Sequence, residues 1–209
     1  MLTDVDSTVA CLGSPGEEER FAHPAGGDVC TSLSITPPLW HSLAGQDARP
    51  RRSGGYVDAR LELVHRRVLV AARNGDPTSP WSSNCSTTLP ADAAAAAGRA
   101  AVVERAREAI AADHPAAGTL LSLAELLGVS PYRLSRAFTH DFGVSLTHYR
   151  NRVRVGRALE RLARRRGEPA VLVADLGFAD QAHITRTMRA HLGHPPTAVR
   201  RLLHTQARR

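Results

Sequence analysis

Two kinds of hydrophobic pattern divide the chain. In residues 1–36 the apolar stretches are short, and "STVACLG", "RFAHP" and "DVCTSLSI" are separated by "SPGEEE" and "AGGD". Short apolar stretches between turn residues predict strands joined by turns. The next segment, "PPLWHSLAG", begins with prolines and ends at a glycine, which predicts a short helix.

A helix is predicted over residues 56–74, where apolar residues recur on one face at a spacing of 3.6 residues. The residues of this stripe are Val57, Leu61, Val64, Val68 and Ala71. Either a partner chain covers the stripe, which would make residues 56–74 a homodimer contact, or the strands and a later helix of the same chain cover it. The connector-like "NGDPTSPWSSNCSTTLP" follows, so we predict two regions, residues 1–90 and 91–209.

Helical signals continue to the end of the chain, so the second region is predicted to be all-α. An alanine-rich helix comes first and runs to about residue 113. In the following "SLAELLG", Ser122 and Glu125 have the spacing of a capping box, which predicts another helix beginning at Leu123.

The stretch "VSPYRLSRAF" predicts a further helix directly after a tight turn. Ser130 can cap this helix, and Pro131 suits its first turn, where a missing N–H costs nothing. Leu134 and Phe138 are expected to point into the core, which leaves a polar outer face. Two helices joined in this way predict a helix-turn-helix over about residues 122–140, although an ordinary pair of bundle helices shows the same pattern.

The same layout returns in "LVADLGFADQAHITRTM", about 50 residues later. Asp180 is the expected cap, Ile184 and Met188 are the expected inward positions, and the turn after Gly177 is one residue longer than the first turn. A second helix-turn-helix is therefore predicted over about residues 171–191. The matching pairs are Arg136 and Arg186, Gly143 and Gly193, Thr147 and Thr197, and Arg150 and Arg200.

Between the two copies, "LTHYRNRVRVGRALERLARRR" predicts one continuous helix over residues 146–166, with an apolar inner stripe and its arginines elsewhere. Its 21 residues would span about 31 Å, close to the ~34 Å of one turn of a DNA duplex. Two helices held at the ends of this rod could address consecutive major grooves on one face of a duplex.

The charge of the chain is unevenly placed. Residues 99–209 carry 19 Arg against 9 Asp and Glu, a balance of +10, whereas residues 1–98 carry 8 against 11, a balance of −3. A basic half joined to a mildly acidic one indicates that the C-terminal half meets a polyanion. The alternative is a solvated, arginine-rich surface.

The composition also excludes several classes of protein. The chain contains no lysine, so it has neither a P-loop lysine nor a Schiff-base lysine. Cys11, Cys30 and Cys85 form no C-x-x-C pair, which favours free thiols in a reducing, cytoplasmic compartment. No signal-peptide pattern or run of ~18 apolar residues is present. We therefore expect no membrane association, no cofactor and no catalytic activity.

Residues from about 101 to 205 resemble the DNA-binding domain of the AraC/XylS family of transcription regulators. The resemblance is strongest in "GFADQAHITRTMRAHLGHPPTAVRR", which is similar to the long signature of that family. The departures from the signature concern packing: Ile184, Met188, Pro196 and Val199. The implied function is a sequence-specific, double-stranded DNA-binding regulator of transcription, with its operator and RNA polymerase as partners.

The resemblance also implies which residues meet DNA. Base contacts are expected from Tyr132, Ser135 and Arg136 in the first unit and from Gln181, Ala182, His183, Thr185 and Arg186 in the second. Phosphate contacts are expected from Ser130, Arg133, Arg150 and Arg200, although the last two can also cap or pair within the chain. Arginine suits the guanine O6 and N7 acceptors, and glutamine suits adenine.

In this family a sensing domain, often cupin-like and followed by dimerising helices, usually precedes the DNA-binding domain. Only about 36 residues precede the first predicted helix here, too few for a closed cupin barrel. Either the start is misplaced or the sensor is reduced to a small β-containing remnant. The fold class we predict is therefore mainly α, with an all-α double helix-turn-helix domain after this N-terminal region.

A second class of function would join the DNA-binding domain to a redox-responsive, metal-responsive or alkyl-accepting N-terminal region. The candidate groups are His23 and Cys30, with Cys11 or His41. No metal-ligand spacing is present among them, so no metal site is predicted. The sequence does not reveal the operator, the effector or the direction of regulation.

Overall fold

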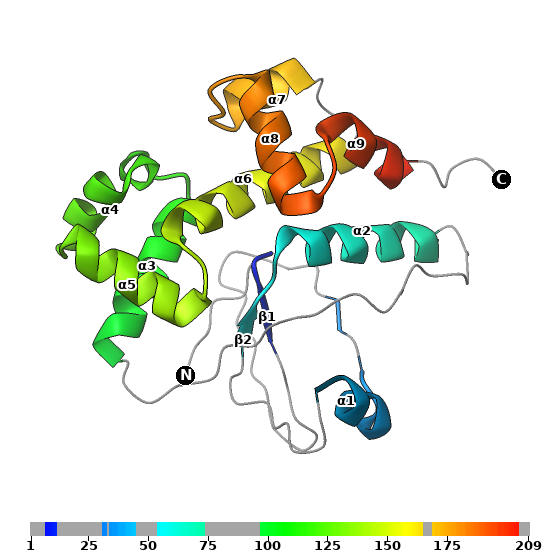
Figure 1. The fold of residues 1–209 in the computed structure, drawn as a ribbon, viewed down its shortest axis with the longest axis horizontal. Coiled ribbons are helices and arrows are strands. Elements are labelled where there is room, and N and C mark those ends of the chain that lie inside the picture. Colours follow the sequence, from blue (N-terminus) through cyan, green and yellow to red (C-terminus); the bar gives the residue numbers. More distant parts are fainter. Residues whose placement is uncertain are drawn as a thin grey trace.

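The computed structural model describes residues 7–11, 31–32, 34–44, 54–73, 97–164 and 169–204 (Figure 1). Two short strands and a 3-10 helix accompany the α-helices of this part of the chain. The elements are β1 (Val9–Cys11), α1 (Pro37–Ala44), β2 (Gly54–Tyr56), α2 (Ala59–Arg73), α3 (Ala97–Ala111), η1 (Pro115–Gly118), α4 (Leu120–Leu127), α5 (Pro131–Phe142), α6 (Leu146–Ala163), α7 (Pro169–Asp175), α8 (Gln181–Leu192) and α9 (Pro196–His204). The predicted mainly α fold is confirmed.

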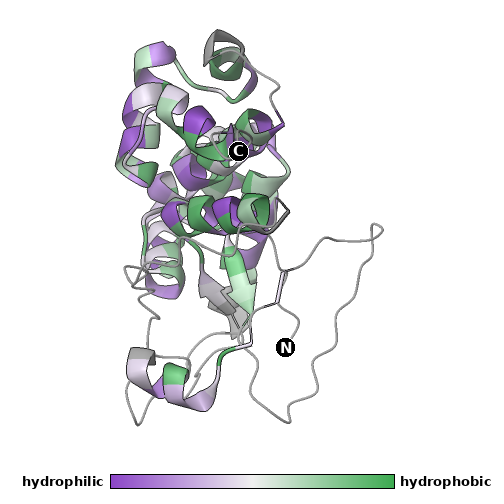
Figure 2. Cartoon of the chain, turned by 90° about the vertical axis from the view of Figure 1, so that its right-hand side faces the viewer, coloured by the Kyte–Doolittle hydropathy of each residue, from purple (hydrophilic) through white to green (hydrophobic). Residues whose placement is uncertain are grey.

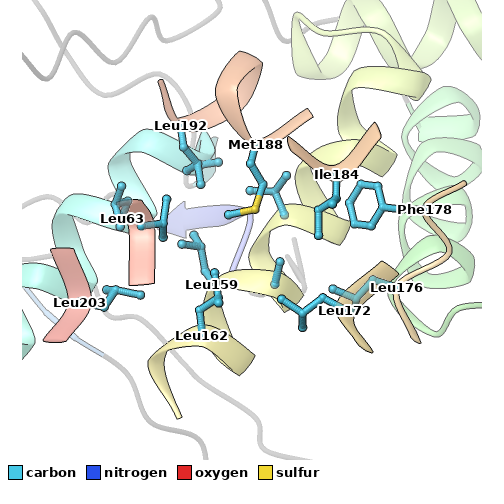
Figure 3. Packing of buried hydrophobic residues seen from close by; sticks show 14 residues of the cluster. Leu63, Leu159, Leu162, Leu172, Leu176, Phe178, Ile184, Met188, Leu192 and Leu203 are labelled. Carbon is cyan, nitrogen blue, oxygen red and sulfur yellow. The ribbon is translucent and has the colours of Figure 1, made fainter. Parts of the chain in front are cut away.

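Helix α6 is the axis of the molecule. Figure 1 shows α3, α4 and α5 at one end of it and α7, α8 and α9 towards the other. Each end has its own hydrophobic core. The first core is formed by α3, η1, α4, α5 and the first turn of α6, and the second by the rest of α6 with α7, α8, α9 and α2. Figure 3 shows Leu63 of α2 in the second core, beside side chains of α6 and α8.

Both predicted helix-turn-helix units are present, as α4 with α5 and as α7 with α8. Ser130 and Asp180 cap α5 and α8 as predicted, accepting hydrogen bonds from the backbone N–H groups of Arg133 and His183. The inward positions are also as predicted, since Leu134, Phe138, Ile184 and Met188 are fully buried.

The predicted capping box is wrong. Helix α4 begins at Leu120, not Leu123, because Thr119 is the N-cap and its side chain accepts the N–H of Ser122. The Ser122 hydroxyl donates instead to the carbonyl of Ala116, 2.8 Å away in η1. The η1 turn therefore leads directly into α4, and Ser122 ties the two together.

The backbone has the same conformation at the glycine of each turn. Gly128 ends α4 at a φ of 67°, and Gly177 follows α7 at a φ of 68°. A residue with a Cβ atom costs free energy in this left-handed region of the backbone. Glycine at both positions therefore lets the chain turn sharply after each helix. Helix α5 begins three residues after Gly128 and α8 four residues after Gly177, which agrees with the longer second turn inferred from the sequence.

The linking helix is shorter than predicted and one of its arginines is buried. Helix α6 has 18 residues, about 27 Å at the usual rise, and ends at Ala163 instead of residue 166. Its arginines were expected to lie off the inner stripe, but Arg152 is 0% exposed. Arg152 lies three residues after Tyr149 and four before Gly156, which are both buried, so its position belongs to the inner face.

The N-terminal predictions are partly confirmed. Strand β1 lies within the first predicted strand, and α1 is the predicted helix that ends before Gly45. The segment "RFAHP" lies outside the described residues, and the described part of "DVCTSLSI", residues 31–32 and 34–35, forms no strand. Helix α1 stands apart from the helical body in both views (Figures 1 and 2).

Tyr56 is in a strand and not in the predicted helix. Strand β2 pairs antiparallel with β1, with Tyr56 opposite Val9, and α2 begins only at Ala59. Helix α2 packs on α6, α8 and α9 of its own chain, through Ala59 and Leu63. The apolar stripe noted in the sequence is half-buried at Val57, Leu61, Val64 and Val68 and fully buried at Ala71.

Candidate nucleic-acid interface

The outer face of α5 presents polar side chains from its first two turns. Tyr132 is 69% exposed, Arg133 and Arg136 are exposed, and Ser135 is half-buried. The guanidinium of Arg136 donates to the Tyr132 hydroxyl over 2.9 Å and lies 5.5 Å from the centre of its ring. This pairing orders two long side chains on the helix surface before any ligand arrives, which lowers the entropy lost on binding.

The outer face of α8 is polar in the same way. Gln181, Ala182 and Arg186 are exposed, while His183 and Thr185 are half-buried. His183 packs edge-on against Phe178, and its Nδ1 accepts the backbone N–H of Ala179 over 3.3 Å. The Thr185 hydroxyl donates to the carbonyl of Gln181 over 2.8 Å. Gln181 and Arg186 therefore remain the long side chains of this face that extend into solvent.

The residues predicted to contact phosphate fall into two groups. Ser130 and Arg133 lie at the start of α5, where the backbone N–H groups of the helix are also directed outward. Arg200 is exposed on α9. Arg150, its counterpart at the repeat offset, is half-buried, and its Nη1 donates to the carbonyl of Gly118 over 3.0 Å. Burial lowers the pKa of the Arg150 guanidinium, and the nearby Arg154 lowers it further.

The two copies therefore place equivalent arginines differently. Arg150 pairs within the chain, as one of the sequence-based alternatives had it, and links α6 to the turn that precedes α4. Its neighbour Arg157 donates to the carbonyl of Ala111 and lies 3.1 Å from the carboxylate of Asp113, at the end of α3. Both arginines thus satisfy carbonyls at the end of α3 and before α4, which fixes the first unit on α6.

One direct contact between the units is made by two histidines. The rings of His148, in the first turn of α6, and His191, at the end of α8, lie 4.4 Å apart between centres. Partial burial lowers the pKa of both rings, and lowers that of His191 to about 4. The neutral rings can stack, whereas two protonated rings would repel each other across this contact.

Sequence reasoning missed the residues that hold the interface in place. Arg152 lies 2.7 Å from the Glu62 carboxylate and donates to the carbonyls of Val57 and Ser7. Glu62 is 5% exposed, on a helix that the sequence treated as a separate region. The spacing of Arg152 from the buried residues of α6 could have indicated that it is buried. An arginine is usually exposed, so its residue type indicated the opposite.

The described residues offer no support for a metal-dependent region. They contain no group of three or more His, Cys, Asp or Glu side chains that could hold an ion. Cys11 is half-buried in β1 and His41 lies in α1, whereas His23, Cys30 and Cys85 lie outside the described residues. Among the described helices, none combines the length and apolar character that a bilayer crossing requires.

One family model and one solved structure are similar to parts of this chain. A family model described as a helix-turn-helix domain matches residues 123–202, a range that contains α5 to α8 in full. Among solved structures, the chain is similar to the C-terminal domain of AraT, a response regulator from Geobacillus stearothermophilus, with 30% sequence identity. That similarity covers 48% of this chain and 84% of the other, with a TM-score of 0.45. No curated protein matches the chain.

Proposed function

The chain belongs to the AraC family and is a DNA-binding transcription regulator, and on that premise we propose that α5 and α8 enter consecutive major grooves of one operator. One observation carries this proposal. Each of the two helices buries its apolar side chains and exposes a polar face in its first turns, and the cores beneath them occupy the two halves of one helix, α6.

The proposed base contacts follow from the exposed side chains of the two faces. Arg136 and Arg186 occupy equivalent positions and can each donate two hydrogen bonds to guanine O6 and N7. Gln181 suits adenine, and Tyr132 adds an apolar ring with a polar tip. Ser135, Ala182, His183 and Thr185 lie on the same faces and complete the proposed base-contact set.

Phosphates are the proposed partners of Ser130, Arg133 and Arg200. Arg150 can join them only if its guanidinium leaves the Gly118 carbonyl, so its expected contribution is smaller than that of Arg200. The length of α6, about 27 Å, is shorter than one duplex pitch of ~34 Å. We therefore expect the DNA to bend toward the protein to bring both grooves within reach.

Residues 1–90 are proposed to form a sensing and dimerisation region, with a second copy of the chain and a small-molecule effector as its candidate partners. RNA polymerase is a further candidate partner of the protein. The half-buried stripe of α2 supports a homodimer contact because it remains partly accessible after α2 has packed on its own chain. Light scattering at micromolar concentration that shows only monomer would remove this contact from the proposal.

The experiment that tests the base-reading role is selection of a site from random DNA with the full chain, followed by binding of an Arg186→Ala variant. The loss on the selected site is expected to be ~1–3 kcal/mol, and the loss on random DNA much smaller. Arg189→Ala is the matched control, because Arg189 is exposed on the same helix but lies in its last turn. Equal losses on selected and random DNA would rule out base reading by Arg186.

Salt dependence separates DNA binding from a protein-interaction role. Contacts to phosphates release counterions, so the logarithm of the affinity should fall against the logarithm of the salt concentration by about 0.9 per contact. Arg200→Ala should reduce this slope by roughly one contact. A flat salt response would favour a helical bundle that binds no nucleic acid.

A further inference from the structure

We infer that residues 54–63, together with Arg152, form an inter-unit clamp that fixes the spacing and angle between the two helix-turn-helix units. Tyr56, Glu62 and Arg152 are then positioning residues for two-site DNA recognition. The consequence for DNA rests on the proposed function, whereas the clamp itself is a property of the free protein.

One end of the clamp is attached to the first unit. The ring of Tyr56 lies 6.3 Å from that of Tyr149 and 6.4 Å from that of Phe142, so it packs on the aromatic side of the first core. Val57 continues the chain from there and donates its N–H to the carbonyl of Thr8 over 2.8 Å. The Thr8 hydroxyl is in turn 2.9 Å from the Tyr149 hydroxyl, which ties the chain beside the two-stranded sheet to α6.

The other end belongs to the second unit. Ala59 and Leu63 are 1% and 6% exposed, and both lie within the core formed by α6, α7, α8 and α9. Only two residues separate Tyr56 from Ala59, so a very short stretch of chain touches both cores. A stretch this short cannot extend further. Any rotation of one unit against the other must therefore break the contacts of Tyr56 with the first core or those of Ala59 with the second.

The middle of the clamp is a buried ion pair. Arg152 is 0% exposed and uses three guanidinium nitrogens: Nη1 lies 2.7 Å from Glu62, Nε donates to Val57 and Nη2 donates to Ser7. Glu62 also accepts two hydrogen bonds from Arg66 on the next turn of α2. Because an isolated buried charge is very costly, this pair holds α2 at one depth and one angle on α6.

Gly156 makes room for this arrangement. A Cβ atom at position 156 would lie 2.9 Å from Nη1 of Arg152 and 3.2 Å from Oε2 of Glu62, closer than carbon normally approaches these groups. The small residue in the middle of α6 is thus explained by the ion pair of Arg152 with Glu62 of α2.

Helix α6 alone does not set the geometry of the two units. A helix resists bending along its length, and Arg150 and Arg157 hold the first unit on it. The second unit, however, packs on α6 mainly through apolar side chains, which can shift against one another. The clamp restricts this movement of the units because it is bound to α6 at Arg152, which lies between the two cores. For DNA recognition this means one preferred separation between the two half-sites, with a penalty for others.

The direct test measures the distance between the units in the free protein. Spin labels are placed at His140→Cys on α5 and Ala190→Cys on α8, both exposed, in a chain whose Cys11, Cys30 and Cys85 are replaced by serine. Pulsed electron paramagnetic resonance should give one narrow distance distribution. Tyr56→Ala should broaden it or add a second distance, because the attachment to the first core is lost.

Leu127→Ala is the control, because Leu127 is a 6% exposed core residue of α4 that the clamp does not contain. It should lower the melting temperature without changing the distance distribution. The clamp is refuted if folded Tyr56→Ala keeps the narrow distribution, or if Leu127→Ala broadens it equally. Leu63→Ala provides a second clamp variant, in case Tyr56→Ala does not fold.

A second measurement follows the consequence on DNA. Inserting one base pair between the half-sites of the selected site rotates them by about 35° and should lower the affinity of the unaltered chain roughly tenfold. Tyr56→Ala should bind both spacings with similar affinity. Equal discrimination by both proteins would overturn the positioning role. If the chain binds no DNA, the proposed function fails while the distance measurement still decides on the clamp.

Discussion

The core beneath α5 is rich in aromatic rings, whereas the core beneath α8 is mostly aliphatic and incorporates part of α2. In the first unit Phe138 packs on Phe142 and Tyr149 at ring distances of 5.1 and 5.0 Å. In the second unit the residues 50 positions later are Met188, Leu192 and Val199, and Ala59 and Leu63 of α2 complete the core.

The two outer faces are nevertheless alike. Helices α5 and α8 both begin at a side-chain cap two or three residues after a left-handed glycine, and both expose an arginine in their second turn. Caps and turns fix the direction of a helix locally, while the core only has to fill space beneath it. The surface that we propose for DNA is therefore repeated, whereas the packing that supports it is not.

The largest expected effect is a loss of stability when the ion pair between α2 and α6 is removed. Glu62→Gln leaves Arg152 buried without its counter-charge and should reduce the free energy of unfolding by about 3–5 kcal/mol. Urea denaturation measures this loss. Glu160→Gln is the control, because the Glu160–Arg164 pair is exposed and should be worth less than about 1 kcal/mol.

The same variant sharpens the comparison of the two units. Since α2 completes the core of the second unit, Glu62→Gln should accelerate amide hydrogen exchange in α8 more than in α5. Equal acceleration in both helices would mean that the two cores unfold as one cooperative unit. The packing of α2 on the second core would then not make the stability of the two units different.

The turns should respond equally in the two units. Gly128→Ala and Gly177→Ala each force a side chain into the left-handed region, and each should cost about 1–2 kcal/mol. A Cβ at position 128 has nothing within 4 Å, and one at 177 has only the end of Arg154, so backbone strain dominates both. Melting temperatures measure the effect, and an unchanged value for either variant would contradict the turn geometry.

Acid should weaken the contact between the units. His191 has a folded-state pKa of about 4, below the ordinary histidine value of 6.5, because of burial and of the neighbouring His148 and Arg152, which Asp58 opposes. The unfolded chain therefore takes up this proton first, so stability is complete above pH 6.5 and falls as the pH drops toward 4. Partial exposure limits the loss to about 1 kcal/mol.

A His191→Gln variant isolates this effect from the other histidines. The difference in unfolding free energy between the variant and the unaltered chain should depend on pH between 6.5 and 4 and be constant above 7. A difference that stays constant through the acid range would show that the His148–His191 contact does not resist protonation.

The smallest expected effect concerns a feature present in the first unit alone. Tyr132→Phe removes the hydroxyl that accepts from Arg136 but keeps the ring beneath the guanidinium, so affinity for the selected site should fall by only about 0.5 kcal/mol. A fluorescence binding assay at fixed salt measures it. A loss as large as that of Arg136→Ala would show that the hydroxyl itself contacts a base.

Much of the fold could be predicted because it is decided locally. The caps Ser130 and Asp180, the inward position of Ile184 and the longer second turn all follow from residues within one or two helical turns. The capping box at Ser122 failed because Thr119, three residues earlier, provides the same chemistry, and the apolar pattern could not choose between the two.

The support of the site could not be predicted, because its contacts are distant in sequence. Arg152 meets Glu62, Val57 and Ser7, which lie about 90 to 145 residues earlier in the chain. Nor could the burial of Arg150 be inferred from its match with Arg200, since equivalent positions in the repeat face different neighbours. A repeated pattern predicts repeated local geometry only.

Hydroxyl-radical footprinting of the selected site with the full chain tests the pairing of α5 and α8 most directly. We predict two protected segments on one face of the duplex, with centres about 10 base pairs apart, and selective loss of one segment with Arg136→Ala and of the other with Arg186→Ala. A single protected segment, or the same segment weakened by both variants, would contradict two-groove recognition.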